Sequence, residues 1–95
     1  MKQGFFQQHW RNVNDNPVGG ISCGRGFTIS WQNGPLGRDE SRQEPNGAFV
    51  EDIIQAVIGR IKFYQNSRFA CEENAEAIKH LKFAAHYLDM RTKKR

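Results

Sequence analysis

The stretch VEDIIQAVIGRIKFY, residues 50–64, decides how this chain folds, because its apolar residues recur at helical spacing. They form one stripe of the kind that a helix buries in a core: Val50, Ile53, Ile54, Val57, Ile58, Ile61 and Tyr64. Asn46 precedes the stretch and is a candidate helix cap, and Glu51 and Asp52 lie near the positive end of the helix dipole. We therefore predict a first helix over residues 47–65.

A second helix is predicted over residues 71–92, after the short turn NSRFA at 66–70. Its inner stripe consists of Asn74, Ile78, Leu81, Ala85 and Leu88. Two helices with so short a connection must lie antiparallel. Residues 47–95 are therefore expected to form a long helical hairpin.

Residues 1–46 have a different composition, with six glycines between positions 19 and 37. In FTISWQNGPLGR, residues 27–38, Phe27, Ile29 and Trp31 alternate with polar residues, which predicts a strand with one apolar face. Asn33-Gly34 and Pro35 end that strand, and residues 38–46 form a polar linker. The prediction is an α+β fold of one domain, in which a small N-terminal β element (1–46) precedes the hairpin (47–95).

Each predicted helix carries a second apolar stripe on its opposite side: Phe49, Ala56, Gly59 and Phe63 on the first, and His80, Phe83, Tyr87 and Met90 on the second. A hairpin buries only one side of each helix, and one or two strands cannot cover both outer stripes. A glycine at position 59 weakens the helix but permits another helix to approach closely. We therefore predict a homo-oligomer; the alternative is a monomer in which the N-terminal piece covers this surface.

Composition narrows the class of protein. The chain has 95 residues, a formal net charge of +4 and two cysteines, and no apolar run reaches membrane-spanning length. The contexts of Cys23 and Cys71 differ and no secretory segment precedes them, so we expect a reduced, cytosolic protein that does not act at a membrane. The basic balance favours anionic partners, although several cations simply crowd the C-terminal helix end.

Catalytic and metal-binding patterns are absent from the sequence. His9, His80 and His86 lack the spacing of metal ligands, and nothing places a base beside Cys71, which is expected to cap a helix or to be buried. The Gly-x-Gly of CGRGF lacks the third glycine of a dinucleotide fold. We therefore predict no enzyme activity, no metal and no cofactor.

Binding residues are easier to identify. Asn74 lies on an inner stripe, where its amide must form hydrogen bonds, either to the turn between the helices or to a polar ligand. Arg91 lies seventeen residues further along the same helix, about 25 Å away. In an antiparallel dimer of hairpins, Arg91 of one subunit approaches Asn74 and Tyr64 of the other, so that a phosphate-binding group meets a base-binding aromatic ring and an amide.

Three runs resemble the phage-encoded anti-Thoeris sponge family, the first type of Thoeris anti-defence protein: ISWQNGPLGR, EPNGAFVEDIIQAVIGRIKFYQ and FACEENAEAIKHLKFAAHYLDMRT. The resemblance covers roughly residues 19–92, and the helical hairpin alone is shared with anti-CBASS sponges. It implies a dimer or hexamer in the host bacterial cytoplasm that sequesters cyclic ADP-ribose isomers made by Thoeris TIR proteins, without cleaving them. Hexameric members also bind cyclic dinucleotides or trinucleotides of CBASS at separate sites.

Carried onto this chain, the resemblance implies Arg38 and Arg91 as pyrophosphate contacts and Tyr64 or Phe63 as the ring that stacks on adenine. It implies Asn74 as the side chain that recognises a polar edge of the ligand. The NGPLG loop would then fix Arg38 and exposed backbone amides at the mouth of an intersubunit site. The alternative is an ordinary turn between strand and helix.

Two other functions remain open at this point. A small basic nucleic-acid-binding protein would use the C-terminal RTKKR on phosphates, although the sequence disfavours this partner. A protein-interaction role would use the stripe of Phe83, Tyr87 and Met90.

Overall fold

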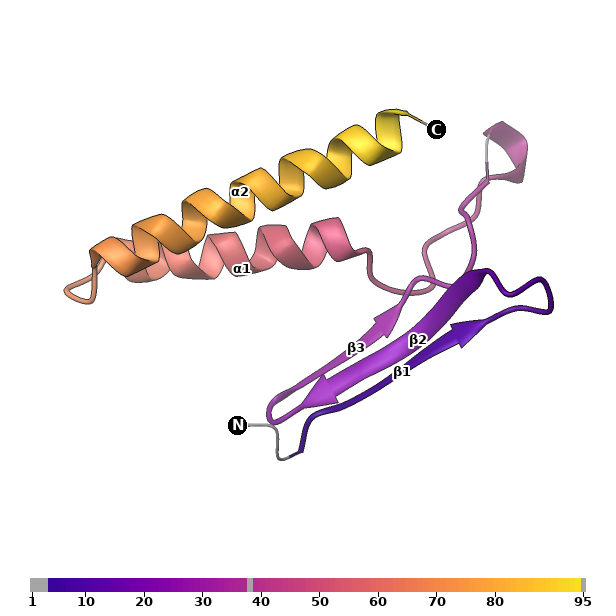
Figure 1. Cartoon of the computed structure of the whole chain (residues 1–95), viewed down its shortest axis with the longest axis horizontal. Coiled ribbons are helices and arrows are strands. Elements are labelled where there is room, and N and C mark those ends of the chain that lie inside the picture. Colours follow the sequence, from indigo (N-terminus) through magenta and orange to yellow (C-terminus); the bar gives the residue numbers. More distant parts are fainter. Residues whose placement is uncertain (1–3, 38, 95) are drawn as a thin grey trace. The chain divides into compact units, whose positions relative to one another are not determined.

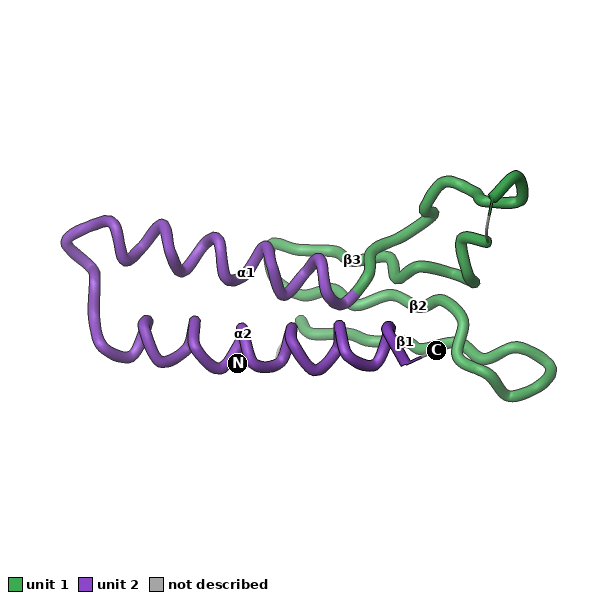
Figure 2. The backbone as a smooth tube through the Cα atoms, turned by 90° about the horizontal axis from the view of Figure 1, so that it is seen from above, with its two compact units in different colours: residues 1–49 green, residues 50–95 purple. Residues whose placement is uncertain are grey.

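The chain has α+β architecture, as predicted, in a computed structural model that describes residues 4–37 and 39–94. Its elements follow one another as β1 (Phe6–Arg11), β2 (Pro17–Gly24), β3 (Phe27–Trp31), the 3-10 helix η1 (Asp39–Ser41), α1 (Val50–Gln65) and α2 (Glu72–Lys93) (Figure 1). The chain divides into two compact units, Met1–Phe49 and Val50–Arg95 (Figure 2). Each unit is described below by itself.

The N-terminal unit contains an antiparallel sheet in the order β1-β2-β3. The predicted strand is confirmed as β3, but the sheet has three strands rather than the one or two on which the oligomer argument relied. β1 and β2 were not predicted individually, because FQQHWR is mostly polar and PVGGISCG is rich in glycine.

A polar chain of hydrogen bonds joins the three strands. Trp31 Nε1 donates to Ser22 Oγ at 2.8 Å, and Ser22 Oγ donates to Gln7 Oε1 at 2.7 Å. Ser22 is buried and therefore needs these partners. Because each of the three residues comes from a different strand, these hydrogen bonds help to fix the register of β1, β2 and β3.

The segment before α1 folds back on the end of β3. Ala48 N donates to Ser30 O at 2.7 Å, and Gln32 N donates to Ala48 O at 2.9 Å. A Cβ atom at Gly47 would lie 2.5 Å from the Trp31 carbonyl carbon, so only glycine permits this close backbone contact. We call residues 46–48 the clip.

Asn46 belongs to the clip and does not cap the helix, so that prediction is wrong. Its side chain accepts a hydrogen bond from Asn33 N and donates one to Asn33 O. α1 consequently begins later than predicted, at Val50. The predicted polar linker also contains a short helix, η1.

The C-terminal unit is the predicted antiparallel hairpin, and Figures 1 and 2 show α1 and α2 running side by side in opposite directions. Ile58 is buried at 4% exposure, and the inner stripe of α2 is half-buried along its whole length. The helical period of the apolar residues therefore identified the packed face of α2 correctly. On α1 it was correct only in part, because Val50, Val57 and Tyr64 of the predicted inner stripe are exposed.

The turn between the helices is held by a side-chain amide. Gln65 Oε1 accepts from Cys71 N at 2.9 Å, and Gln65 Nε2 donates to Cys71 O at 3.1 Å. Cys71 occupies the N-cap position, but its thiol is exposed and forms no capping hydrogen bond. The expectation that this cysteine caps the helix with its side chain or is buried is therefore wrong.

The outer stripes of the hairpin remain largely exposed. Phe63, Phe83 and Tyr87 expose more than half of their surface. Apart from the surrounding turns of α1 itself, no described atom lies within 4 Å of a Cβ atom placed on Gly59, so no other described element approaches it closely. Neither α1 nor α2 is long and apolar enough to cross a membrane.

Candidate functional site

An aromatic cluster with an arginine lies on the last turns of α1. The rings of Phe63 and Tyr64 are 6.2 Å apart, at an interplanar angle of 54°. The Arg60 guanidinium carbon lies 5.0 Å from the Phe63 ring centre and 5.1 Å from that of Tyr64, and Arg60 Nε donates to the Tyr64 hydroxyl at 3.2 Å. Both candidate stacking residues therefore share one surface with a cation.

Asn74 begins α2 at the same end of the hairpin. Its Nδ2 donates to Phe69 O at 3.4 Å, which is the structural bond to the turn that the sequence left open. Its side-chain oxygen forms no hydrogen bond with any residue that the structure describes. The amide is thus held by the turn and still presents an acceptor.

Arg91 lies at the opposite end of the hairpin. Its Nη2 is 3.5 Å from Glu51 Oε2, and the two side chains are 53% and 34% exposed. The structure therefore brings together Phe63, Tyr64 and the start of α2 at one end, and it leaves Arg91 at the other. Arg38, the remaining predicted contact, lies outside the described residues.

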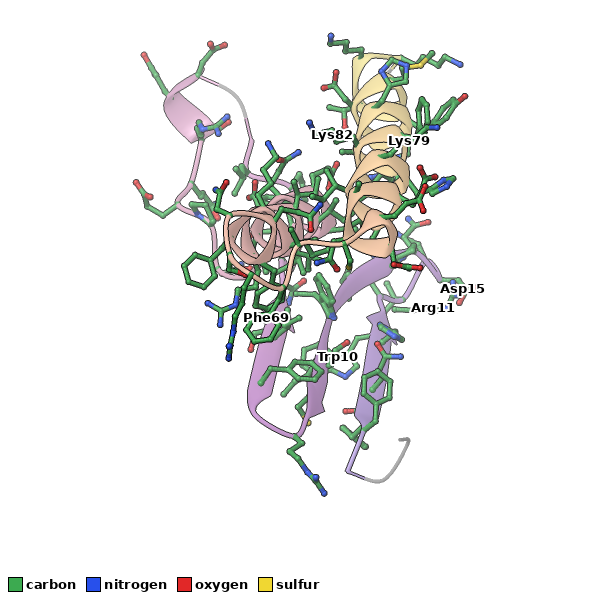
Figure 3. All side chains as sticks on the ribbon, turned by 90° about the vertical axis from the view of Figure 1, so that its left-hand side faces the viewer. Trp10, Arg11, Asp15, Phe69, Lys79 and Lys82 are labelled. Atoms are coloured by element: carbon green, nitrogen blue, oxygen red, sulfur yellow. The ribbon has the colours of Figure 1, made fainter. Side chains whose placement is uncertain are left out.

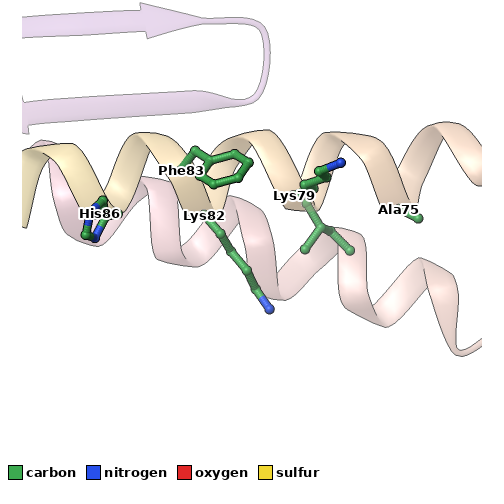
Figure 4. Close-up of a pocket in the computed structure, with 6 residues that line it drawn as sticks. Ala75, Lys79, Lys82, Phe83 and His86 are labelled. Atoms are coloured by element: carbon green, nitrogen blue, oxygen red, sulfur yellow. The ribbon is translucent and has the colours of Figure 1, made fainter.

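An open groove of about 610 Å³ runs along α2. Figure 4 shows Phe83 and Lys82 near its middle, and the lining residues are Ala75, Ile78, Lys79, Lys82, Phe83 and His86. Lys79 and Lys82, also labelled in Figure 3, form no ion pair with a described residue. The groove was not predicted from the sequence, although its residues recur at helical spacing.

The described part of the chain contains no group of three or more histidine, cysteine or acidic side chains that could hold a metal ion. Cys23 and Cys71 are both free.

Residues 25–93 match the Acb2/Tad1 hairpin domain. The chain belongs to this family. One similar protein is Thoeris anti-defense 1 of Bacillus phage SBSphiJ7. It is 40% identical over 73 residues, which cover 77% of this chain and 49% of that protein. The chain therefore spans about half the length of that Acb2/Tad1 relative. The resemblance inferred from the sequence is confirmed, and all five predicted site residues fall within the matched hairpin domain.

The sequence reasoning missed Arg60 as a member of the aromatic cluster. Its signal was present, because residues 60, 63 and 64 are three and four positions apart and therefore share one helix face. Arg68, whose guanidinium carbon lies 4.9 Å from the Phe69 ring centre in the turn, was missed as well.

Proposed function

We propose that this protein is an anti-defence sponge that binds cyclic ADP-ribose isomers in the bacterial host cytoplasm and holds them intact, so that the Thoeris effector is not activated. The observation that carries the proposal is the 40% identity to a protein named for Thoeris anti-defence, within a matched Acb2/Tad1 hairpin domain. The exposed aromatic and arginine groups support it, because they suit a ligand with a planar base and two phosphates.

The binding site is formed between two antiparallel copies. Asn74 and Arg91 are equally distant along α2 from the midpoint between Lys82 and Phe83. A two-fold axis at that midpoint brings Asn74 of one copy opposite Arg91 of the other. The same operation repeats at both ends, so a dimer has two equivalent sites.

The groove on α2 supports this register, because the same axis pairs its residues either with one another or with the outer stripe: Ala75 with Met90, Ile78 with Tyr87, Lys79 with His86, and Lys82 with Phe83. Apolar side chains meet apolar ones, and Lys82 meets an aromatic ring. The acidic start of α2, with Glu72 and Glu73, faces the basic end, with Arg91 and Lys93. The acidic first turn and the basic last turn of α2 would thus attract each other across the axis.

The site residues have distinct roles in this arrangement. Phe63 or Tyr64 stacks on adenine, the Asn74 side-chain oxygen accepts a hydrogen bond from a polar edge, and Arg91 of the second copy binds the pyrophosphate, together with Arg38. The described residues of the site include neither a nucleophile paired with a base nor a metal ligand set, which favours capture without cleavage. Cyclic dinucleotides or trinucleotides would bind at a separate site.

The test is calorimetric titration against a panel of cyclic ADP-ribose isomers and cyclic oligonucleotides, followed by heat denaturation and mass spectrometry of the released ligand. We expect tight binding of at least one cyclic ADP-ribose isomer and its recovery unchanged. Recovery of linear ADP-ribose would identify an enzyme, and lack of binding across the panel would overturn the proposal. Light scattering distinguishes a dimer from a hexamer.

A cysteine cross-link tests the register. In a variant with Cys23 and Cys71 replaced by serine, Phe83→Cys should form a disulfide-linked dimer, because the two cysteines meet near the axis. Glu76→Cys is the matched control on the same helix, since its two copies would be separated by about 20 Å along the axis. A monomeric protein, or equal cross-linking of both variants, would exclude this dimer.

A further inference from the structure

The Arg60 guanidinium lies over both candidate stacking rings, those of Phe63 and Tyr64. Its guanidinium lies at nearly the same distance from both ring centres, 5.0 and 5.1 Å, and its Nε donates to the Tyr64 hydroxyl. The helix places the three side chains on one face, because residues three and four positions apart are neighbours on its surface. The three side chains therefore form one local unit at the end of α1.

The charge of Arg60 has no carboxylate partner in the described part of the chain. The ion pairs found there belong to Arg11, His80, Arg91 and Lys93. The hydrogen bond to Tyr64 uses only Nε, so both outer nitrogen atoms of the guanidinium remain without an acceptor among these residues. An arginine in this state can order the rings and still bind an anionic oxygen.

We propose that Arg60 is a positioning residue, which holds Phe63 and Tyr64 as a preformed stacking surface and directs its outer nitrogen atoms to an anionic group of the ligand. This inference rests on the proposed function. Exposed aromatic side chains otherwise lose rotational freedom when a base binds, and ordering them beforehand lowers that cost. Phe63 is 62% exposed, so Arg60 still leaves ring surface for a base.

The first test needs no ligand. In the free protein, ring currents should shift the NMR signal of the Arg60 Nε proton away from those of exposed arginines. The shift should shrink when Phe63 or Tyr64 is replaced by leucine. An unshifted signal, or one that neither replacement changes, would overturn the positioning role.

The second test compares matched variants by calorimetric titration with the cyclic ADP-ribose isomer that the wild-type protein binds. Arg60→Ala should weaken binding about 5- to 30-fold, the range expected for losing two ring contacts and their ordering. Arg60→Lys, which keeps the charge, should recover part of the loss, and Tyr64→Phe should weaken binding by less than about 3-fold.

Arg68→Ala is the control, since it removes one arginine stacked on a ring, Phe69, without touching the Arg60 unit. We expect it to change binding by less than about 2-fold. Equal losses in Arg60→Ala and Arg68→Ala would overturn the inference by showing a general charge effect. If the wild-type protein binds no member of the panel, the proposed function fails, and the ring-current measurement still decides whether Arg60 orders the rings.

Discussion

Replacing Arg91 by alanine separates a structural role of this residue from a ligand-binding role. The only partner of its side chain among the described residues is Glu51, at 3.5 Å, and both groups are substantially exposed. Such a pair contributes about 0 to 1 kcal/mol to folding. For a domain of this size, the melting temperature should therefore fall by less than about 8 °C.

The effect of Arg91→Ala on binding should be much larger. A hydrogen bond to a charged group contributes about 1.5 to 3 kcal/mol, so capture of a cyclic ADP-ribose isomer should weaken about 10- to 100-fold in calorimetric titration. The size measured by light scattering should not change.

Glu51→Ala is the matched control, because it breaks the same ion pair and leaves the arginine in place. It should produce a similar change in melting temperature and no loss of capture. If Glu51→Ala weakened capture as much as Arg91→Ala does, the arginine would act through its ion pair, and the reasoning would be refuted.

Four further substitutions test the fold, each by urea denaturation. Ile58→Ala should lower the free energy of unfolding by about 2 to 5 kcal/mol, since this side chain is 4% exposed, and a loss below about 1 kcal/mol would contradict its place in the core. Ser22→Ala leaves Trp31 Nε1 without its acceptor and should cost about 1 to 3 kcal/mol; an unchanged tryptophan fluorescence transition would argue against the bond. Gly59→Ala should raise the free energy of unfolding by about 0.5 to 1 kcal/mol, because no described residue outside the surrounding turns of α1 lies near its Cβ position, and a decrease would indicate a neighbouring chain there. Gly47→Ala should instead destabilise the N-terminal unit by at least about 1 kcal/mol, because its Cβ would collide with the backbone of Trp31, and full stability would show that the clip can shift.

The helical hairpin could be predicted from the sequence because a helix depends on local spacing. Ile58 and the half-buried stripe of α2 follow directly from the apolar period of the sequence. The start of α1 could not be predicted in the same way. Asn46 has the side chain of a helix cap, but its hydrogen bonds go to Asn33, thirteen residues earlier, and no local rule anticipates that contact.

The candidate site was predictable only in part, for a similar reason. The residue types and their positions on the helices could be identified, and the bond from Asn74 to the turn was one of two stated alternatives. The groove on α2 and the position of Arg60 between two rings depend on side-chain conformations, which spacing constrains but does not determine. The meeting of Asn74 with Arg91 requires a second copy and remains a prediction.

The clip also makes the two edges of the sheet differ in how many of their backbone groups are paired. Ala48 occupies backbone groups at the end of β3, whereas β1 pairs only with β2 among the described residues and is exposed along its whole length. An edge strand with unpaired backbone groups can pair with a strand of another molecule and so start aggregation. Polar or charged side chains on the edge strand, such as Gln8, His9 and Arg11, oppose this pairing. Replacing these polar side chains with valine or isoleucine would therefore favour fibrous aggregation from β1.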